Sequence, residues 1–439
     1  MARSARAQEE IRRFLDIGAV QVAELDLDGD EAVLRPGPGS PPVTHGEVFV
    51  LVRQGGRPVG TLLARVPEGA DAKSVLAARA RAECAPAPAP ARGPGAAGDP
   101  RASGESGEPP YTSVVIATRE RAGQLARALD SLLAQDHPRF EIVVVDNAPV
   151  TSETRELVER KYAERVRYVR EPVPGLAVAH NTGLAAVRGE VVAFTDDDVV
   201  ADPRWLTELT APFAADPGLG CSTGLILPAR LTTPAQVLLE SHGGFAKGFT
   251  PRTYDPARPP GDEPLFPFTA GRFGSGANMA FRTAALRSVG GFDPATGAGT
   301  AARGGDDLYG FVRVLAQGHR LRYTPYALVW HHHRETWRDL ETQAYGYGAG
   351  LTAYLTAVLV NRPALLPAFL ARLPRGLAHA RTLTAVRETE GGGAPGDHDV
   401  RTHPWPRRLS RLQRRGMVYG PVGYLRARRA LRARVEGAR

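Results

Sequence analysis

The sequence predicts an α/β fold built on a doubly wound, mostly parallel sheet. Between residues 111 and 195, continuous apolar runs alternate with amphipathic segments, and several of the runs end in polar residues. Continuous apolar runs indicate strands that are covered on both faces. Strands that alternate with helices pair in parallel, and such sheets bind ligands beyond the carboxyl ends of their strands. A small N-terminal α+β module and a C-terminal helical, arginine-rich extension are expected to flank this domain.

The elements of the main domain are predicted in a regular order. Strands are expected at 112–118, 141–147, 165–171 and 190–195. Helices are expected at 123–135, 151–163 and 175–189. The first helix is predicted because leucines recur on one of its faces, at Leu125, Leu129, Leu132 and Leu133. Thr151 or Ser152 is the expected N-cap of the second helix, and Gly189 the expected end of the third.

Changes of composition divide the chain into four segments. Residues 1–84 contain four short β-like runs followed by a helical segment, and they carry no chemical signature. This module would either dock a partner or acceptor, or brace the main domain. Residues 85–109 are rich in Ala, Pro, Gly and Ser, which predicts an extended linker. The main domain is placed at 110–340 and the helical extension at 341–439.

The positive charge of the chain is concentrated in its last residues. The formal net charge is +8, but residues 401–439 hold 12 arginines and one acid, so the remaining 400 residues sum to −3. This tail would either touch an anionic membrane or form a solvated appendage, and no nucleic acid is expected as a partner. The two cysteines, Cys84 and Cys221, exclude a disulfide framework. The sequence shows no signal peptide and no long apolar stretch. The expected location is therefore cytoplasmic, either free or peripherally bound to the inner face of the membrane.

Polar clusters follow three of the predicted strands. The clusters are 118–121, 146–147 and 196–198, and the last consists of three consecutive aspartates. Two carboxylates ~5 Å apart at an effective dielectric of ~20 repel by about 3 kcal/mol. Protonation or a bound cation relieves such repulsion. A hard divalent ion, Mg²⁺ or Mn²⁺, suits carboxylates that face a substrate diphosphate.

Other phosphate-binding motifs do not fit. The segment after the first strand, "TRERAG", does not match the G-x-G-x-x-G of dinucleotide folds. No Walker A sequence occurs, and no strand is predicted before "GAGTAA" at 297–302. "DLDGD" at 26–30 lacks the later glycine and glutamate of an EF-hand loop, and is interpreted as a hairpin turn.

An ordered set of eight motifs resembles the bacterial family 2 glycosyltransferases. The motifs are "SVVIATRER", "EIVVVDN", "PGLAVAHNTG", "VVAFTDDD", "FGSGANMAFR", "GGFD", "GGDDL" and "WHHHR". Each is weak alone, but their order and spacing over residues 111–350 are specific. The resemblance implies a GT-A-type fold and an inverting, metal-dependent transfer of sugar from a nucleotide-diphosphate sugar to an acceptor hydroxyl. That acceptor would be a glycan, a lipid-linked molecule or a small molecule.

The resemblance also implies roles for individual residues. Donor and nucleotide binding would fall to Thr118, Arg119, Glu120, Asp146, Asn181, Asp196 and Asp197. The metal, Mg²⁺ or Mn²⁺, would be held by Asp198, Asp196 and His331. The loop bordering the sugar and acceptor would contain Gly274, Ser275, Gly276 and Asn278. The catalytic base would be Asp307, with Asp306 beside it.

This chain departs from the family pattern at three places. His180 replaces a common arginine, which leaves its nucleotide contact open. Asp306 replaces a common glutamate, so the division of roles between Asp306 and Asp307 stays open. Three histidines in a row leave His333 as an alternative to His331.

Two further questions concern the extension and the reaction class. Residues 341–373 predict two apolar helices broken at Pro363, which would either pack on the main domain or lie on a membrane. The absence of a Q-x-x-R-W motif favours transfer of single sugars over processive synthesis. The alternatives to a glycosyltransferase are a sugar-nucleotide pyrophosphorylase and a non-catalytic sugar-nucleotide-binding or scaffold protein.

Overall fold

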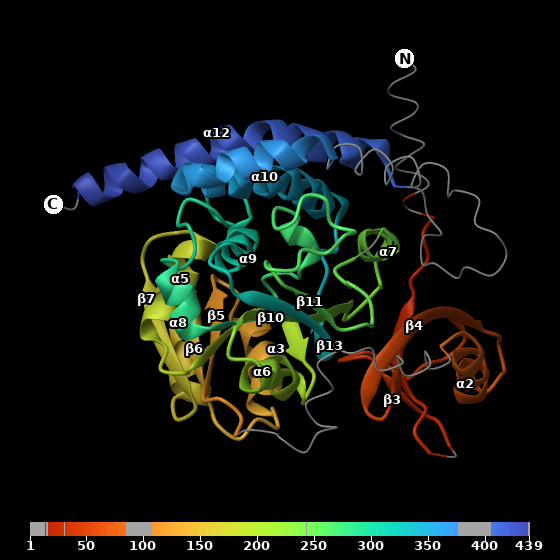
Figure 1. The fold of residues 1–439 in the computed structure, drawn as a ribbon. Helices are drawn as coiled ribbons and strands as arrows, with labels where there is room; N and C mark the ends of the chain where they lie inside the picture. Colours follow the sequence, from red (N-terminus) through yellow and green to blue (C-terminus); the bar gives the residue numbers. More distant parts are fainter. Residues whose placement is uncertain are drawn as a thin grey trace.

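The protein contains a small sheet and a large sheet, joined side by side (Figure 1). The computed structural model describes residues 14, 16–29, 31–84, 108–242, 244–375 and 405–437. The small sheet has the order β2-β1-β3-β4 and is followed by one helix. Its elements are β1 (Gln21–Asp26), β2 (Val33–Pro36), β3 (Gly46–Gln54), β4 (Arg57–Val66) and α2 (Ala72–Glu83). These elements match the four β-like runs and the helix predicted for the N-terminal module.

The large sheet has the order β11-β13-β10-β12-β8-β5-β6-β7, and β9 pairs with β13 outside this path. The strands are β5 (Thr112–Thr118), β6 (Phe140–Asn147), β7 (Val166–Glu171), β8 (Val191–Asp196), β9 (Val199–Ala201), β10 (Leu219–Pro228), β11 (Arg252–Tyr254), β12 (Met279–Arg282) and β13 (Arg320–His331). β5, β6, β7, β8, β10 and β13 run in one direction, and β12 runs against its neighbours β8 and β10. The predicted mostly parallel α/β fold is confirmed.

Helices cover both faces of the large sheet, as a doubly wound fold requires. They are α3 (Ala122–Leu133), α4 (Glu153–Leu157), α5 (Leu176–Ala186), α6 (Trp205–Ala215), α7 (Pro234–Ser241), α8 (Thr283–Ser288) and α9 (Asp306–Ala316). On one face Leu125 and Trp205 pack against Val114 of β5. On the other face Leu286 and Phe311 belong to the core that contains Val115. Consecutive valines of β5 therefore enter opposite cores, which explains why its sequence is apolar without alternation.

Two of the predicted helices differ in detail from the sequence prediction. The helix expected at 151–163 is α4 continued by a π-helical turn at Val158–Tyr162. The helix expected to end at Gly189 ends at Ala186 because Val187 has extended backbone angles. Gly189 has another function there, since a Cβ atom on it would lie 2.6 Å from the backbone nitrogen of Ser113. Its small size allows the chain to enter β8 close beside β5.

The small sheet packs between α2 and the main domain. Leu25, Val50 and Leu62 form a core with α2, while Phe49 and Leu51 pack on Leu227 and Trp330 of the main domain. At the junction Arg53 pairs with Asp202 of the main domain at 2.6 Å and with Glu24 at 2.6 Å. The buried contact favours a bracing role for the module. Most of the predicted linker, residues 85–107, lies outside the described residues.

The C-terminal helices cross the top of the main domain (Figure 1). α10 (Trp337–Asn361) is followed by the helical turn η3 (Pro363–Leu365), and α12 (Arg407–Gly437) lies along α10. The contact between them is very close: a Cβ atom on Gly348 would lie 1.9 Å from the carbonyl oxygen of Gln413. Small residues in both helices therefore let the backbones meet. Leu340, Ala353 and Tyr354 of α10 are buried, so this helix packs on the main domain.

Length and composition argue against a single spanning helix in the described residues. Only the pair Trp337–Asn361 and Pro363–Arg375, bent by 110° at its break, is long and apolar enough when the two helices are taken together.

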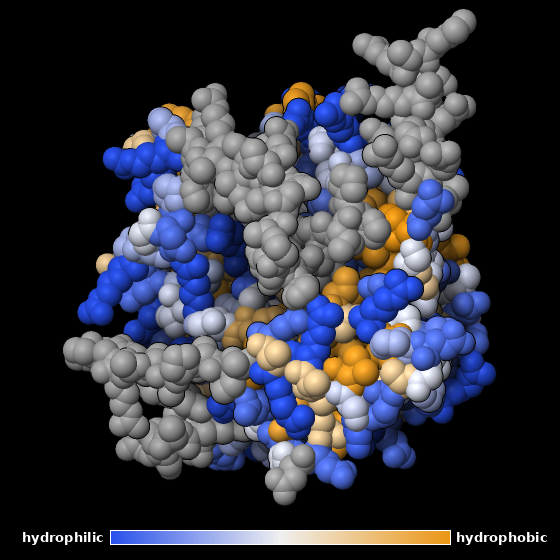
Figure 2. Space-filling view, turned by 90° about the vertical axis from the view of Figure 1, so that its right-hand side faces the viewer, coloured by the Kyte–Doolittle hydropathy of each residue, from blue (hydrophilic) through white to orange (hydrophobic). Residues whose placement is uncertain are grey.

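The side of the molecule that carries the small sheet has an elongated group of apolar side chains between hydrophilic ones (Figure 2).

Candidate active site

The polar ends of β5, β6 and β8 lie side by side, as the sequence predicted. In the pairing register Thr118 is opposite Asp146, and Ala117 is opposite Asp196. The short turn at Asp197 and Asp198 then leads into β9, which pairs with β13. This pairing places Val199 opposite His331, so the last residue of β13 lies next to the aspartates.

Three of the predicted metal ligands converge at this turn. One ligand atom each from Asp196, Asp198 and His331 lies within 4.8 Å of the others. Nε2 of His331 is 3.2 Å from Oδ1 of Asp198. Both Asp198 and His331 are buried, and Asp198 Oδ1 has no aligned hydrogen-bond donor among the described residues. Two carboxylates and an imidazole suit Mn²⁺ or Mg²⁺, and an orphaned carboxylate oxygen is a position that a cation would satisfy.

A chain of hydrogen bonds orients His331. Its Nδ1 is 3.1 Å from Nδ1 of His333, and Nε2 of His333 is 3.0 Å from Glu240. With Glu240 accepting from His333 Nε2, His333 Nδ1 can accept from His331 Nδ1, which leaves the lone pair of His331 Nε2 for a metal. The structure therefore separates the two histidines that the sequence left as alternatives. His331 reaches the aspartates, and His333 supports it from behind.

The three aspartates have different electrostatic environments. Burial and the charge of Asp198 raise the pKa of Asp196 to about 7. Burial opposes ionisation of Asp198 too, but the positive charges of protonated His331, Arg334 and Arg121 act against it, and the pKa of Asp198 lies below its ordinary value. The proton on His331 Nε2 would leave when a metal binds there. Asp197 turns toward Thr118, whose hydroxyl donates to it at 2.7 Å, and toward Arg121 at 3.1 Å. Thr118 and Asp197, both predicted to contact the nucleotide, are thus buried partners of each other.

Arginines surround a cavity of about 390 Å³ beside Asp198. Arg127, Arg230 and Arg334 line it together with His332. Burial and the charges of Arg127 and Arg230 lower the pKa of His332 to about 4, so this histidine is neutral near pH 7. A cationic wall next to two acidic metal ligands is an arrangement that suits a diphosphate together with its counter-ion.

The ends of β5 and β6 carry three further residues of the predicted site, Asp146, Glu120 and Arg119. Asp146 is fully buried, accepts a hydrogen bond from the hydroxyl of Tyr168 at 2.8 Å, and keeps its other oxygen without a donor among the described residues. Burial raises the pKa of this carboxyl. Glu120 accepts from the backbone nitrogens of Val150 and Thr151, at 2.8 and 3.1 Å, so it holds the loop after β6. Arg119 is exposed.

The predicted base lies at the start of α9. Oδ2 of Asp307 accepts from the backbone nitrogen of Gly276 at 2.9 Å, and Oδ1 accepts from that of Leu308 at 2.8 Å. Burial and the charge of Asp306 raise the pKa of Asp307 to about 6. Asp306 is turned inward, where it faces Nδ1 of His180 at 3.1 Å. The structure thus gives the two neighbouring acids different partners.

His180 lies between the two acidic clusters. Its ring packs on Phe194, two residues before Asp196, at a centroid distance of 4.9 Å. Its charge acts on the carboxyls of both Asp196 and Asp307. Where the family commonly has an arginine, this chain therefore uses the histidine to hold Asp306.

Three predicted pocket residues have structural contacts instead. Asn278 is fully buried, accepts from the indole of Trp205 at 2.8 Å, and donates to the carbonyls of Leu225 and Ala327. Asn181 bonds both backbone groups of Phe292. Gly274 has φ of 154°, and a Cβ atom on it would lie 2.5 Å from Thr223. The expected close approach of a ligand to Gly274 is replaced by this protein contact. Ser275 and Gly276 are half-buried and stay beside Asp307.

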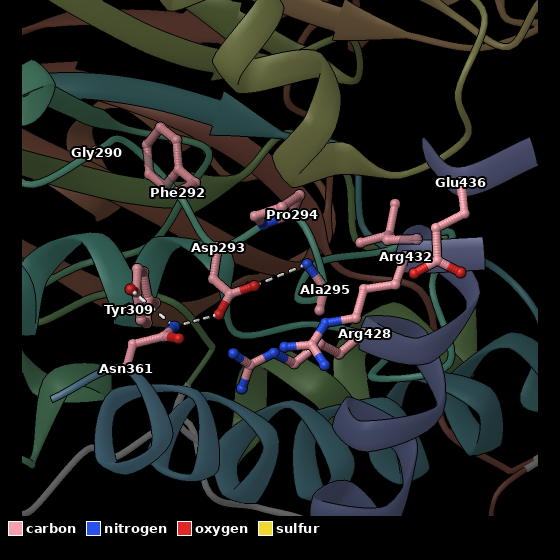
Figure 3. Close-up of a pocket in the computed structure, with 11 residues that line it drawn as sticks. Gly290, Phe292, Asp293, Pro294, Ala295, Tyr309, Asn361, Arg428, Arg432 and Glu436 are labelled. Atoms are coloured by element: carbon pink, nitrogen blue, oxygen red, sulfur yellow. Dashed lines mark hydrogen bonds between the residues drawn. The ribbon is translucent and has the colours of Figure 1, made fainter. Parts of the chain in front are cut away.

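The loop at 290–295, which Asn181 contacts through Phe292, is also bonded to the two C-terminal helices. In the loop at 290–295, Asp293 accepts hydrogen bonds from Asn361 of α10 at 2.6 Å and from the backbone nitrogen of Ala295 at 2.9 Å (Figure 3). Asp293 also accepts from the hydroxyl of Tyr424 of α12 at 2.9 Å. A cavity of about 500 Å³ lies next to these contacts, with the side chains of Arg428 and Arg432 running into it (Figure 3). The loop therefore connects α10 and α12 to the back of the site.

Sequence reasoning missed several residues that complete the site. Arg121 and Arg334 lie 3.6 and 3.9 Å from Asp198, and both stand within motifs that were recognised for other residues. Lys247 follows α7, in a segment without a motif. Its side chain is close enough to Asp307 for the two charges to interact. Only folding brings Lys247 near Asp307, so no sequence signal could have found it.

Comparisons with known proteins agree with the site. The profile of the family described as "Glycosyl transferase family 2" matches residues 113–288. An uncharacterized protein y4gI of Sinorhizobium fredii is 37% identical over 117 residues, which are 26% of this chain and 13% of that protein. A pre-mycofactocin glycosyltransferase of Mycobacterium tuberculosis is 29% identical over 242 residues, 54% of this chain and 46% of that protein. The chain thus matches less than half the length of these two relatives.

One solved structure with a similar arrangement is a mannosyltransferase, PcManGT, from Pyrobaculum calidifontis, in complex with GDP-Man and Mn²⁺. It is 20% identical and overlaps 72% of this chain and 87% of its own, with a TM-score of 0.45. The family assignment does not depend on this likeness. It depends on the profile match and on the named relative, which together identify residues 113–288 as a glycosyltransferase family 2 domain.

Proposed function

We propose that this protein transfers a sugar from a nucleotide-diphosphate sugar to an acceptor hydroxyl, with inversion at the anomeric carbon and one sugar per reaction. The observation that carries the proposal is the presence of two separate carboxylate clusters, both of which lie near His180. Asp196, Asp198 and His331 form a cation-binding group, and Asp307 stands apart with a raised pKa.

The donor would occupy the edge formed by β5, β6 and β8. The unpaired oxygen of the buried Asp146 supports a hydrogen bond to the nucleobase at one end. The arginines around Asp198 support binding of the diphosphate at the other end. A bound Mg²⁺ or Mn²⁺, held by Asp196, Asp198 and His331, would supply charge stabilisation for the departing nucleoside diphosphate.

Asp307 would act as the general base. The bond between the acceptor oxygen and the anomeric carbon forms while the bond from that carbon to the diphosphate oxygen breaks. The proton of the acceptor hydroxyl passes to the carboxylate of Asp307, and the nucleoside diphosphate leaves with the electron pair. A base with a pKa of about 6 is ionised at pH 7 and still accepts a proton readily. A single base on the acceptor side supports inversion over retention.

Asp307 is favoured over Asp306 because of the partners that each has. Asp306 is buried beside His180, with its Oδ2 3.1 Å from Nδ1 of the histidine. Asp307 is half-buried, and its bonds to two backbone N–H groups fix the carboxylate beside Ser275 and Gly276. His180 then acts as a positioning residue for the acidic pair.

Single-sugar transfer is proposed because the chain has no Q-x-x-R-W sequence. The identity of the sugar, the nucleobase and the acceptor depends on the shape of the pocket.

The deciding experiment measures release of nucleoside diphosphate from a panel of UDP-, GDP- and TDP-sugars, with Mn²⁺, with Mg²⁺ and with EDTA. Release that requires metal and hydroxyl acceptor, with product of inverted configuration by NMR, is the expected result. Metal-dependent donor binding without turnover would instead identify a sugar-nucleotide-binding scaffold. Formation of sugar nucleotide from a nucleoside triphosphate and a sugar phosphate would identify a pyrophosphorylase.

A further inference from the structure

The C-terminal helix α12 is unusually rich in arginine. In the described residues of this helix there are ten arginines and one acid, Glu436. Arg408 pairs with Glu341, and Arg426 lies over the ring of Tyr419. Most of the other arginines point away from the domain and need a different explanation.

Exposure along α12 follows a helical period. The inner side, which contacts α10, is made of buried residues such as Leu409, Gly416, Gly420, Tyr424 and Ala427. The opposite side is exposed along the whole helix, and we refer to it as the outer strip. The outer strip consists of Arg407, Arg411, Arg414, Arg415, Val418, Val422, Leu425 and Arg429. Spacings of three, four and seven residues place these side chains on one face.

The outer strip has an apolar centre between two cationic ends. Val418 is 81% exposed, and Val422 and Leu425 are 46% and 44% exposed. Single exposed aliphatic residues are common, but here three of them adjoin on one face of one helix. Within the described residues, none of the five strip arginines forms an ion pair. From Arg407 to Arg429 the strip is about 33 Å long.

We propose that the outer strip of α12 docks the protein on the surface of an anionic lipid bilayer. The arginines at both ends would bind lipid phosphates, and their long aliphatic stems let the charged groups stay at the headgroups. Val418, Val422 and Leu425 would enter the boundary between headgroups and acyl chains, as the apolar side of an interfacial helix does.

The composition of the strip selects this partner over others. A nucleic acid would use the arginines but gain nothing from a central aliphatic group, and the strip has no aromatic side chain for stacking. In a symmetric dimer through the same face, the arginine ends would meet arginines of the second copy and repel. A bilayer with anionic headgroups matches both the charged and the apolar part.

Of the two long C-terminal helices, α12 rather than α10 presents the surface that would contact the membrane. α10 lies between α12 and the main domain, and its residues Leu340, Ala353 and Tyr354 are buried there. Hydrogen bonds from Tyr424 to Asp293 and from Thr352 to the carbonyl of Met417 hold α12 in place. The strip would therefore orient the whole domain on the bilayer. This inference is independent of the proposed reaction.

The test is sedimentation of the full chain with lipid vesicles. We expect binding to mixed phosphatidylcholine–phosphatidylglycerol vesicles, weakened by added salt, and no binding to phosphatidylcholine alone. The variant Arg411→Gln/Arg415→Gln/Arg429→Gln should bind roughly 100-fold more weakly, since each arginine near an anionic surface contributes about fivefold. A matched control removes the same charge from exposed positions elsewhere, as Arg65→Gln/Arg165→Gln/Arg188→Gln, and should bind as the wild type does.

A second variant tests the apolar centre. Val418→Ser/Val422→Ser/Leu425→Ser keeps every charge and should lower vesicle affinity by roughly tenfold or more. Circular dichroism checks that each variant keeps its helices. The proposal is overturned if the wild type ignores anionic vesicles, or if both strip variants bind like the control. Equal affinity for a single-stranded oligonucleotide, unaffected by the serine variant, would overturn it in favour of a general polyanion site.

Discussion

The two acidic clusters of the cleft show how one residue type acquires two electrostatic roles. At the end of β8, Asp198 has a lowered pKa because His331 faces it. At the start of α9, Asp307 has a pKa raised to about 6 because it is crowded by protein and by Asp306. The first carboxylate is suited to hold a cation, and the second to accept a proton. Separated pKa values of this kind distinguish acid–base groups from charge-stabilising groups.

The supports of the two clusters differ as well. The β8 cluster is neutralised by cationic side chains from distant segments, Arg121, His331 and Arg334. The α9 cluster is held by one histidine and by backbone N–H groups. Changes in the first cluster should therefore act on metal and diphosphate binding, whereas changes in the second should act on turnover. Four predictions test this division.

The largest effect is expected for Asp307→Asn. Removing the proposed general base should lower the rate of the proposed sugar transfer by about 1,000-fold. Affinity for nucleoside diphosphate in Mn²⁺ should stay near the wild-type value because the β8 cluster is intact. Steady-state release of nucleoside diphosphate and calorimetric binding measure the two quantities. Asp306→Asn serves as the comparison, and an equal or greater loss of rate in that variant would transfer the role of base to Asp306.

The next largest effect is expected for Asp198→Asn. The substitution keeps the shape of the side chain but removes the charge that faces His331, so affinity for nucleoside diphosphate in Mn²⁺ should fall by roughly 100-fold. Binding measured in EDTA should hardly change. An affinity in Mn²⁺ equal to that of the wild type would show that Asp198 is not a metal ligand.

A smaller effect is expected for the residue behind the metal ligand. His333→Ala removes the acceptor that orients His331, and should weaken Mn²⁺ binding by about tenfold. His332→Ala is the matched control, because His332 points into the arginine-lined cavity and supports no ligand. Titration with Mn²⁺ compares the two variants, with melting temperature as the check on folding. Equal losses in both variants would contradict the proposed orientation of His331.

The smallest effect near neutral pH concerns protonation of Asp307. A raised pKa means that the carboxyl is protonated over a wider acidic range, so the base is present above pH 6 and lost below it. The value of kcat/KM should be about half-maximal at pH 6 and fall about tenfold for each further pH unit. The residual activity of Asp307→Asn should lack this acidic limb. A limb that persists in the variant belongs to another group.

Local sequence patterns determined much of the fold and the donor side of the site. Continuous apolar runs predicted β5, β6 and β8, because a strand covered on both faces needs apolar residues at every position. The parallel arrangement then placed Asp146 and Asp196 at one edge, since the carboxyl ends of neighbouring parallel strands meet. The arginine surplus of the C-terminal segment was likewise evident from composition.

Only the tertiary structure decided which side chains serve the site and which serve the fold. Asn278 and Gly274 lie in a recognised motif, but Trp205 and Thr223, from other segments, occupy the space around them. His331 and His333 alternate along the chain, and the pairing of β13 with β9 determined which one faces Asp198. The pKa values of Asp198 and Asp307 differ for the same reason. Burial and charge depend on neighbours that are distant in the sequence, and such neighbours exist only once the chain has folded.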